Sequence, residues 1–155
     1  MDDRIEKLAE LLTNHSVSIK KGDYVHLQYG LVAKPLALAI YRRILLKGAV
    51  PVVDVIVADF ERVFYENASD EVLSSEPLTA KVLTTVDCSI RIYAPENTRD
   101  LMHIDSTKIA ARRKVTFPFK EEILKKRNWV LFYYPTLAMA QDADMSLEAF
   151  ENFVF

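Results

Sequence analysis

Residues 23–30 read Asp23-Tyr24-Val25-His26-Leu27-Gln28-Tyr29-Gly30, and the stretch that they open decides the fold. Aromatic and β-branched residues in an alternating pattern are typical of a strand. Leu31 to Lys47 follows with apolar residues at helical spacing, with Pro35 near its start, where a missing N–H costs little, and with Gly48 directly after it. Ala49 to Val57 is an almost continuous apolar run, as in a strand buried on both faces. Strand, helix and strand in so short a span predict a βαβ unit with a right-handed crossover.

Composition limits the classes of protein that the chain can belong to. The sequence has 155 residues, of which 50% are hydrophobic, and this is enough for one well-filled core in a single domain. A net charge of −2 gives no electrostatic case for a nucleic-acid or acidic-lipid partner. The single cysteine, Cys88, excludes an intrachain disulfide, and with only three histidines the common zinc spacings are excluded too. No apolar run has the length of a membrane span or the pattern of a signal peptide, so we expect a cytoplasmic protein without a membrane partner.

Two more strand-like segments complete the predicted sheet. One runs from Cys88 to Ala94, directly before Pro95, and the other is the apolar run Trp129 to Tyr134. The pattern predicts one α/β domain over residues 1–155, a three-layer flavodoxin- or Rossmann-like fold with helices on both faces of a mainly parallel sheet of about four or five strands. The recognisable strands, expected in the order 2-1-3-4, lie near residues 24–29, 50–57, 88–93 and 129–134.

Helical patterns fill the segments between the strands. A first amphipathic helix is expected from Asp2 to Asn14, and three short helices should connect the second and third strands. Pro118 interrupts the next helical segment, so we expect one helix from Asp105 to Arg113 and another from Thr116 or Phe117 to the basic residues 125–127. The remaining signals are a helix-cap spacing at 97–100, a helix at 137–143 capped by Thr136, and a helix capped by Ser146.

No catalytic or metal-binding constellation emerges from the spacing of residues. His15, His26 and His103 each lack a carboxylate, cysteine or second histidine at a ligand spacing, and a surface or core role explains each of them better than a ligand role. Cys88 has no neighbouring base in the sequence and is interpreted as a small buried residue. We therefore predict no catalytic, cofactor-binding or metal-ligating residue in this chain.

A ligand would most simply bind at the carboxyl ends of the strands. The turn from Gln28 to Lys34 has one glycine where a dinucleotide fingerprint has three, and it lacks the ending of a phosphate-binding loop, so nucleotide binding has little support. Open α/β sheets nevertheless bind their ligands at this edge. Asp54 and Arg91 interrupt apolar strands there, although they could also reach solvent or pair with each other. The candidate pocket residues are Gln28, Gly30, Asp54, Arg91, Tyr93 and Thr136.

Two surface features remain. The basic clusters at 112–114 and 125–127 lack interleaved aromatic residues, so they are interpreted as solvated helix ends and not as an RNA-binding surface. The aromatic residues of the tail could belong to the core or form a surface that binds a partner. Their place at the very end of the chain favours the second interpretation. The predicted interdomain or partner surface consists of Phe150, Phe153 and Phe155.

The tail also resembles a known family. The segments Trp129 to Tyr134, Pro135-Thr136-Leu137-Ala138-Met139-Ala140-Gln141 and Met145 to Phe155 resemble the end of the amino-terminal domain of the thermophilic aminopeptidase T family of metallopeptidases. The start is similar to the same proteins in residues 8–12, 18–23, 41–43 and 48–53. The similarity spans nearly the whole chain. Its tail motif is specific, whereas the opening helix and the βαβ unit are generic.

The resemblance implies an enzyme of which this chain is one part. Members of the family are cytoplasmic, usually oligomeric enzymes that remove amino-terminal residues from peptides, and they use two divalent metal ions, such as zinc, cobalt or manganese, held by Glu, His and Asp. Those ligands lie in a carboxyl-terminal catalytic domain that this chain does not contain. The resemblance therefore implies a non-catalytic amino-terminal domain, inactive by itself, that shapes access for the peptide substrate and assists assembly of a homo-oligomer.

Two other classes of function stay open at this point. A free-standing small-molecule-binding α/β domain is supported by the fold alone, and the incomplete glycine fingerprint argues against a nucleotide as its ligand. A protein-interaction module is supported by the apolar tail.

Overall fold

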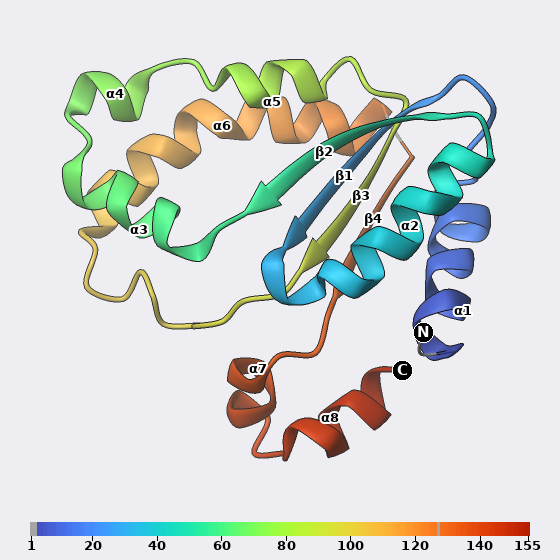
Figure 1. Ribbon diagram of the computed structural model, residues 1–155. Helices are drawn as coiled ribbons and strands as arrows, with labels where there is room; N and C mark the ends of the chain where they lie inside the picture. Colours follow the sequence, from blue (N-terminus) through green and yellow to red (C-terminus); the bar gives the residue numbers. More distant parts are fainter. Residues whose placement is uncertain (1–2, 127) are drawn as a thin grey trace.

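The computed structural model describes residues 3–126 and 128–155, and its centre is one parallel sheet. Its strands lie in the order β2-β1-β3-β4, and every neighbouring pair is parallel (Figure 1). The predicted parallel α/β fold and the order of its strands are thus confirmed. The strands are β1 (Tyr24–Gly30), β2 (Val50–Ile56), β3 (Cys88–Tyr93) and β4 (Asn128–Tyr133).

The βαβ unit forms as its sequence predicts, but β2 is an edge strand with partly exposed side chains, so the expectation of a strand buried on both faces is wrong. Helix α2 (Lys34–Leu46) follows β1 through a short 3₁₀ turn, η2 (Leu31–Ala33), and has Pro35 in its first turn. Gly48 ends the helix in the left-handed region, with φ of +69°, and Gly22 enters β1 with φ of +87°. Both glycines allow the chain to turn in a conformation that a Cβ disfavours.

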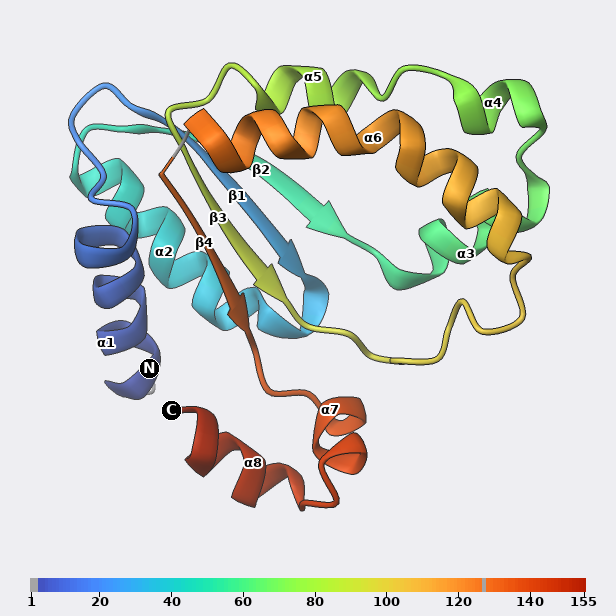
Figure 2. The ribbon, with the colours of Figure 1, turned by 180° about the vertical axis from the view of Figure 1, so that it is seen from behind.

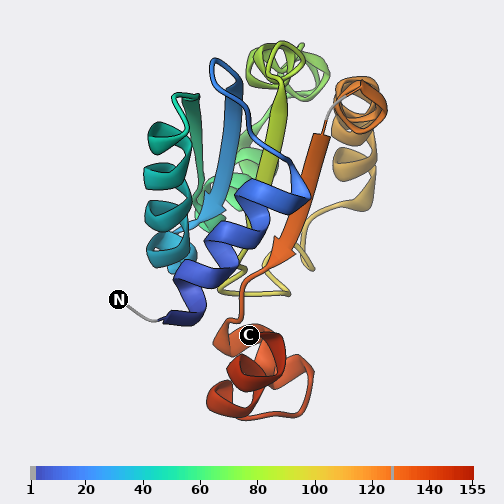
Figure 3. The same ribbon diagram turned by 90° about the vertical axis from the view of Figure 1, so that its right-hand side faces the viewer.

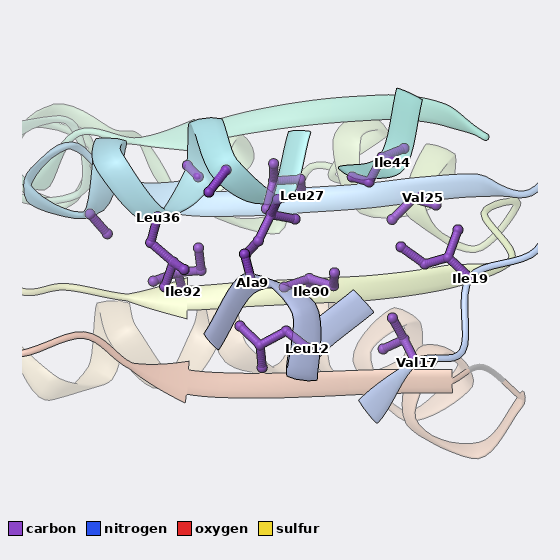
Figure 4. Close-up of a cluster of buried hydrophobic side chains, with 14 of the residues drawn as sticks. Ala9, Leu12, Val17, Ile19, Val25, Leu27, Leu36, Ile44, Ile90 and Ile92 are labelled. Carbon is purple, nitrogen blue, oxygen red and sulfur yellow. The ribbon is translucent and has the colours of Figure 1, made fainter. Parts of the chain in front are cut away.

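The main core lies between one face of the sheet and two helices. Helix α1 (Asp3–Leu11), which continues as a π-helical turn, η1 (Leu12–Ser16), lies over β3 and β4, while α2 lies over β1 and β2 (Figure 4). Ala9 and Leu12 of this layer meet Leu27, Ile90 and Ile92 of the sheet. Alternate strand residues therefore point into this core, as the strand period requires.

A second group of helices lies on the other side of the sheet, but it covers that face incompletely. Its members run from the end of β2 to the start of β4 and pack mainly on one another (Figures 1 and 3). Trp129, Leu131 and Tyr133 of β4 stay substantially exposed on this face. The two faces of the sheet are therefore unequally buried. The helices are α3 (Ala58–Asn67), α4 (Asp70–Ser74), α5 (Leu78–Leu83) and α6 (Ser106–Lys126).

The predicted break at Pro118 is wrong. Helix α6 is continuous from Ser106 to Lys126 and carries Pro118 in its interior. Helix α6 packs against α4 and α5, and tertiary packing commonly overrides such a local breaker. Residues 97–100, expected to cap a helix, form a turn in which Asn97 Oδ1 accepts a hydrogen bond from the Arg99 N–H. The predicted helix start at Asp2 and the basic residue Arg127 lie outside the described residues.

The chain ends in two short helices beyond the carboxyl edge of the sheet. Helices α7 (Leu137–Asp142) and α8 (Leu147–Val154) return the chain toward α1, so that the two ends of the chain lie close together (Figure 2). Thr136 and Ser146 cap them by accepting hydrogen bonds from the backbone of Met139 and Ala149, as predicted. Within residues 3–126 and 128–155 no helix is long and apolar enough to cross a membrane.

Candidate functional site at the carboxyl ends of the strands

A cavity of about 170 Å³ lies where β1, β2 and β3 end. The strands contribute Gly30, Ile56 and Tyr93, and the segment after β3 closes over them. Glycine is required at position 30 because a Cβ there would lie 2.9 Å from the carbonyl oxygen of Ala94. The other lining residues are Leu31, Ala58, Glu61, Ala94, Pro95, Glu96, Asn97, Thr98, Asp100 and Leu101.

The charged lining of this strand-end cavity is acidic. Glu61, Glu96 and Asp100 contribute carboxylates, and none of the described lining residues is basic. Asp100 is partly neutralised because its Oδ1 lies 3.4 Å from Arg62 Nε. The cavity can therefore accept hydrogen bonds from a cation or an N–H group, but it opposes a phosphate. This agrees with the incomplete glycine fingerprint of the preceding turn.

A separate polar row crosses the less covered face of the sheet. Asp54, Gln28 and Arg91 occupy matching positions on the neighbouring strands β2, β1 and β3. Gln28 Nε2 donates a hydrogen bond of 2.6 Å to Asp54 Oδ2. Gln28 thus separates the anionic and cationic side chains. Of the two alternatives that the sequence left open, a direct pair of Asp54 with Arg91 is absent from the ion pairs of the described residues, and the Asp54 side chain is 42% exposed.

His26 lies beneath this row, and its side chain is only 4% exposed. A hydrogen bond of 2.8 Å joins its Nδ1 to Ser89 Oγ, whereas Nε2 lies 3.9 Å from Asp54 Oδ2 and has no hydrogen-bond partner among the described residues. Burial lowers the pKa of His26, an effect that Asp54 opposes and Arg91 reinforces. His26 is therefore a neutral imidazole at pH 7.

The predicted pocket residues consequently fall into three places. Gly30 and Tyr93 line the strand-end cavity, while Gln28, Asp54 and Arg91 form the polar row. Thr136 is buried as the cap of α7 and lines a second cavity of about 380 Å³ beside α7 and α8. The structure therefore does not bring the predicted set together as one pocket.

Sequence reasoning missed other residues of these sites. His26 is buried, which agrees with its interpretation as a surface or core residue, but its neighbourhood with Gln28 was not recognised, although the strand period places the two on the same face. Ser89 is placed beside His26 by the pairing of β1 with β3. Glu61 and Glu96 come from connecting segments, and no periodicity in the sequence indicates that they meet at one cavity.

The described residues do not fit a metal centre. No group of three or more His, Cys, Asp or Glu side chains in residues 3–126 and 128–155 is placed to hold an ion. His103 Nε2 lies 3.0 Å from Glu66 Oε1, and this contact lowers the pKa of Glu66. Burial raises the pKa of Cys88 to about 12, so this thiol is neither a ready nucleophile nor a ready metal ligand.

The three tail aromatics differ in their surroundings. Phe150 is buried, and Phe155 packs against Phe132 and Tyr134, with ring centroids 6.5 Å and 5.9 Å apart. The Arg4 guanidinium lies 5.3 Å from the centre of the Phe155 ring. Phe153 is 78% exposed. A partner surface at this end of the chain would therefore centre on Phe153.

Comparison with known proteins identifies the family of the chain. The family model described as "Thermophilic metalloprotease (M29)" matches residues 1–155. The chain belongs to this family. The resemblance seen in the tail motif and in the opening residues is thereby confirmed. No curated protein sequence matches the chain.

One solved structure has the same fold as this chain. The structure titled "Wild-type AmpT from Thermus thermophilus" has a TM-score of 0.72 and 17% sequence identity, and the match covers 97% of this chain and 41% of that one. At this identity the likeness establishes the fold. The chain described here thus spans about two fifths of that protein. An enoyl reductase, CurK, matches with a TM-score of 0.39 and 13% identity over 96% of this chain and 48% of its own.

Proposed function

We propose that this chain is the amino-terminal, non-catalytic portion of a metal-dependent aminopeptidase that releases amino-terminal residues from peptides. Its membership of the M29 metalloprotease family, over residues 1–155, carries the proposal. The match to two fifths of the AmpT chain supports a place within a larger two-domain enzyme. Its partners are then a carboxyl-terminal catalytic domain, a peptide substrate and further copies of itself, and its compartment is the cytoplasm.

In this proposal, the two divalent ions bind in the catalytic domain and not to the residues of this chain. The described part of the chain gathers no set of ligands for them, which supports a non-catalytic role. What this portion offers instead is a rigid parallel sheet, an acidic cavity at the strand ends and exposed apolar side chains on the less covered face of the sheet. Such a domain can wall off a neighbouring active site and restrict the substrates that reach it.

A free-standing small-molecule-binding domain is the second candidate. The observation that favours it is the pair of cavities beside the carboxyl ends of the strands, where open α/β sheets bind ligands. The acidic lining would select a cationic or N–H-rich ligand.

The test compares the native gene product, purified from its host, with residues 1–155 expressed alone. Both are assayed for release of p-nitroaniline from aminoacyl p-nitroanilides with added Zn²⁺, Co²⁺ or Mn²⁺, and the mass of the native product is measured. We expect a longer native product that hydrolyses the reporters and loses activity in a chelator, whereas residues 1–155 alone neither turn over nor bind metal stoichiometrically. Turnover by residues 1–155 alone would refute their non-catalytic role. An inactive native product of this length would favour the small-molecule-binding domain.

A further inference from the structure

Two opposite charges lie on the less covered face of the sheet without neutralising each other. Arg91 of β3 is exposed and makes no ion pair or side-chain hydrogen bond within residues 3–126 and 128–155. The Asp54 side chain of β2 is 42% exposed, and its Oδ1 accepts no hydrogen bond from the described residues. Both residues interrupt mainly apolar strands, where an unpaired charge is costly. The peptidase proposal gives neither of them a role.

Gln28 holds the two charges apart. Because neighbouring strands lie about 4.8 Å apart, the Cα atoms of Asp54 and Arg91 are separated by about 10 Å, with Gln28 at the matching position between them. Gln28 Nε2 donates its 2.6 Å hydrogen bond to Asp54 Oδ2 and thereby orients the carboxylate. The amide oxygen of Gln28 is left as an acceptor. The polar row therefore presents a carboxylate, an amide oxygen and a guanidinium in line.

His26 supplies a second, buried group without a partner. Its side chain is 4% exposed, and its Nε2 has no hydrogen-bond partner among the described residues although it lies 3.9 Å from Asp54 Oδ2. A buried polar atom that lacks a partner costs free energy. One ammonium nitrogen can lie about 2.9 Å from both atoms. Nε2 is closed to solvent here, so the carboxylate has to shift as such a donor enters.

An apolar strip adjoins the other end of the polar row. Leu131 of β4 pairs in register with Arg91, and Trp129 and Tyr133, two residues to either side, lie on the same face of the sheet. The three side chains, which define the strip, are 38%, 46% and 51% exposed, respectively. The helices on this side pack mainly on one another and leave the strip open (Figures 1 and 3). An apolar group can therefore pack beside the guanidinium.

We propose that the polar row and the apolar strip together bind a small zwitterion with an apolar side chain, an amino acid or a dipeptide. Its ammonium group donates to Asp54 and to His26 Nε2, and its carboxylate accepts a forked pair of hydrogen bonds from Arg91. Its side chain packs against Leu131. A zwitterion satisfies both ends of the row at once, whereas a pure anion or a pure cation would leave one charge unpaired and would be repelled by it.

Only the source of this ligand rests on the proposed function. A peptidase that removes amino-terminal residues releases free amino acids, and the polar row would bind this product away from the metal ions. The binding itself requires no turnover, so it is measured on residues 1–155 alone. An active native enzyme whose residues 1–155 bind no zwitterion would refute the inference and leave the peptidase proposal standing.

The test is a titration of residues 1–155 with L-leucine and with L-leucyl-L-leucine, followed by NMR at pH 7.5. We expect saturable shifts of the amide signals of Gln28 and Arg91 and of the His26 ring below about 10 mM ligand. The ligand with the lower Kd gives the length that the row accepts. No saturable shift at these residues with either ligand up to about 10 mM would refute the proposal.

Blocked ligands separate the two ends of the row. N-acetyl-leucine lacks the ammonium group and leucinamide lacks the carboxylate, so each should bind about tenfold more weakly than leucine. Asp54→Asn should weaken leucine but not N-acetyl-leucine, and Arg91→Gln should weaken leucine but not leucinamide. This crossed pattern cannot arise from a general loss of structure. If either variant weakened all three ligands equally, the assigned contacts would be wrong.

Matched controls remove the same charges elsewhere. Glu71→Gln on α4 and Arg42→Gln on α2, across the sheet, should leave the Kd of leucine unchanged. Leu131→Ala should reduce the advantage of leucine over glycine, because it shortens the apolar strip. Binding that survives Asp54→Asn and Arg91→Gln but is lost in Glu96→Gln would move the ligand to the strand-end cavity and overturn the proposal.

Discussion

At the scale of single residues, His26 shows how a polar group is accommodated within the sheet. Its imidazole is buried beneath Gln28 and Asp54 and has one hydrogen bond, to Ser89. Keeping the ring neutral avoids the cost of a buried charge, which the 3.9 Å separation from Asp54 would only partly offset. The nearby Arg91 adds to the preference for the neutral form.

The pKa of His26 is expected to lie below its ordinary value of 6.5, because burial dominates its surroundings. Titration of the ring protons by NMR measures it directly. Asp54→Asn removes the charge that favours protonation and should lower the pKa further, whereas Arg91→Gln should raise it. His103→Gln, on the exposed Glu66 pair, is the control and should leave it unchanged. Shifts of the same sign in the first two variants would contradict this electrostatic account.

The same residue makes stability depend on pH. Below about 6.5 the unfolded chain takes up a proton at His26 that the folded chain resists, so protonation favours unfolding. The contribution of His26 is thus present above the unfolded pKa and decreases as the pH falls through it. Urea denaturation between pH 7.5 and 5 should show stability falling with pH, and the fall should be smaller in Arg91→Gln than in the parent chain. An identical slope in both proteins would rule out this linkage.

Gly30 is constrained by contact and not by backbone conformation. Its φ is −77°, which any residue adopts, but a Cβ would lie 2.9 Å from the Ala94 carbonyl oxygen and 3.1 Å from the Ala94 Cβ. Gly30→Ala should therefore cost about 1 to 3 kcal/mol of unfolding free energy, as overpacking does. Urea denaturation measures the change.

Gly22 is the matched control for Gly30. It has no atom within 4 Å of a built Cβ, but its φ is +87°. Gly22→Ala should cost about 1 kcal/mol through backbone strain, and Gly22→Asn should cost less because asparagine tolerates that region. At position 30 asparagine should bring no such relief. If asparagine helps equally at both positions, contact is not the reason for Gly30.

At the scale of elements, α6 is the clearest case in which tertiary packing outweighs a low local helix propensity. The helix runs through Pro118, which has no N–H for the carbonyl of Lys114 and whose ring crowds that turn. Tertiary contacts with α4 and α5 hold it, including hydrogen bonds from Arg112 Nη1 to the carbonyls of Leu73 and Ser75, at 3.2 Å and 2.7 Å. These contacts lie far apart in the sequence, so no local pattern could have indicated them.

Pro118→Ala is expected to stabilise the protein by about 1 to 3 kcal/mol, because it restores the helical hydrogen bond and relieves the ring contact. Pro118 is exposed, so the change leaves no cavity in the core. The unfolding free energy in urea measures the gain. Lys114→Ala, exposed in the same helix, should change stability by less than about 0.5 kcal/mol. A loss of stability in Pro118→Ala would mean that the fold depends on the bend that proline imposes.

At the scale of the whole molecule, the tail closes the domain at the end where the first helix begins. Arg4 of α1 donates a hydrogen bond of 3.1 Å to Asn152 Oδ1 of α8 and lies over the Phe155 ring. Phe155 in turn packs on side chains of β4 and of the segment after it. The ends of the chain are therefore joined by contacts of the domain itself.

Phe155→Ala should destabilise the domain by about 1 to 3 kcal/mol, because it removes the ring that bridges Arg4, Phe132 and Tyr134. Phe153→Ala is the control, and since Phe153 is exposed it should change stability by less than about 0.5 kcal/mol. Thermal or urea unfolding compares them. Equal small effects would instead support a tail that packs only against a partner.

The sequence by itself determined the class of fold and the order of its strands. The apolar runs of β1 and β2, the intervening helix and the glycines at its ends allow one arrangement, because a parallel pair requires a crossover and that crossover is right-handed. It also determined the family, since the M29 family model matches residues 1–155. It placed Gly30 and Tyr93 at the carboxyl edge of the sheet, where both line the strand-end cavity, because parallel strands end together.

Only the tertiary structure decided how the sheet faces and the chain ends are used. Period-two alternation tells which residues share a face, but not how far distant helices cover it, so the exposure of Trp129 and Tyr133 could not be foreseen. The continuity of α6 through Pro118 and the separation of Thr136 from the strand-end cavity likewise depend on contacts remote in sequence. Such contacts form only when the elements pack together, so the local propensity of a segment cannot predict them.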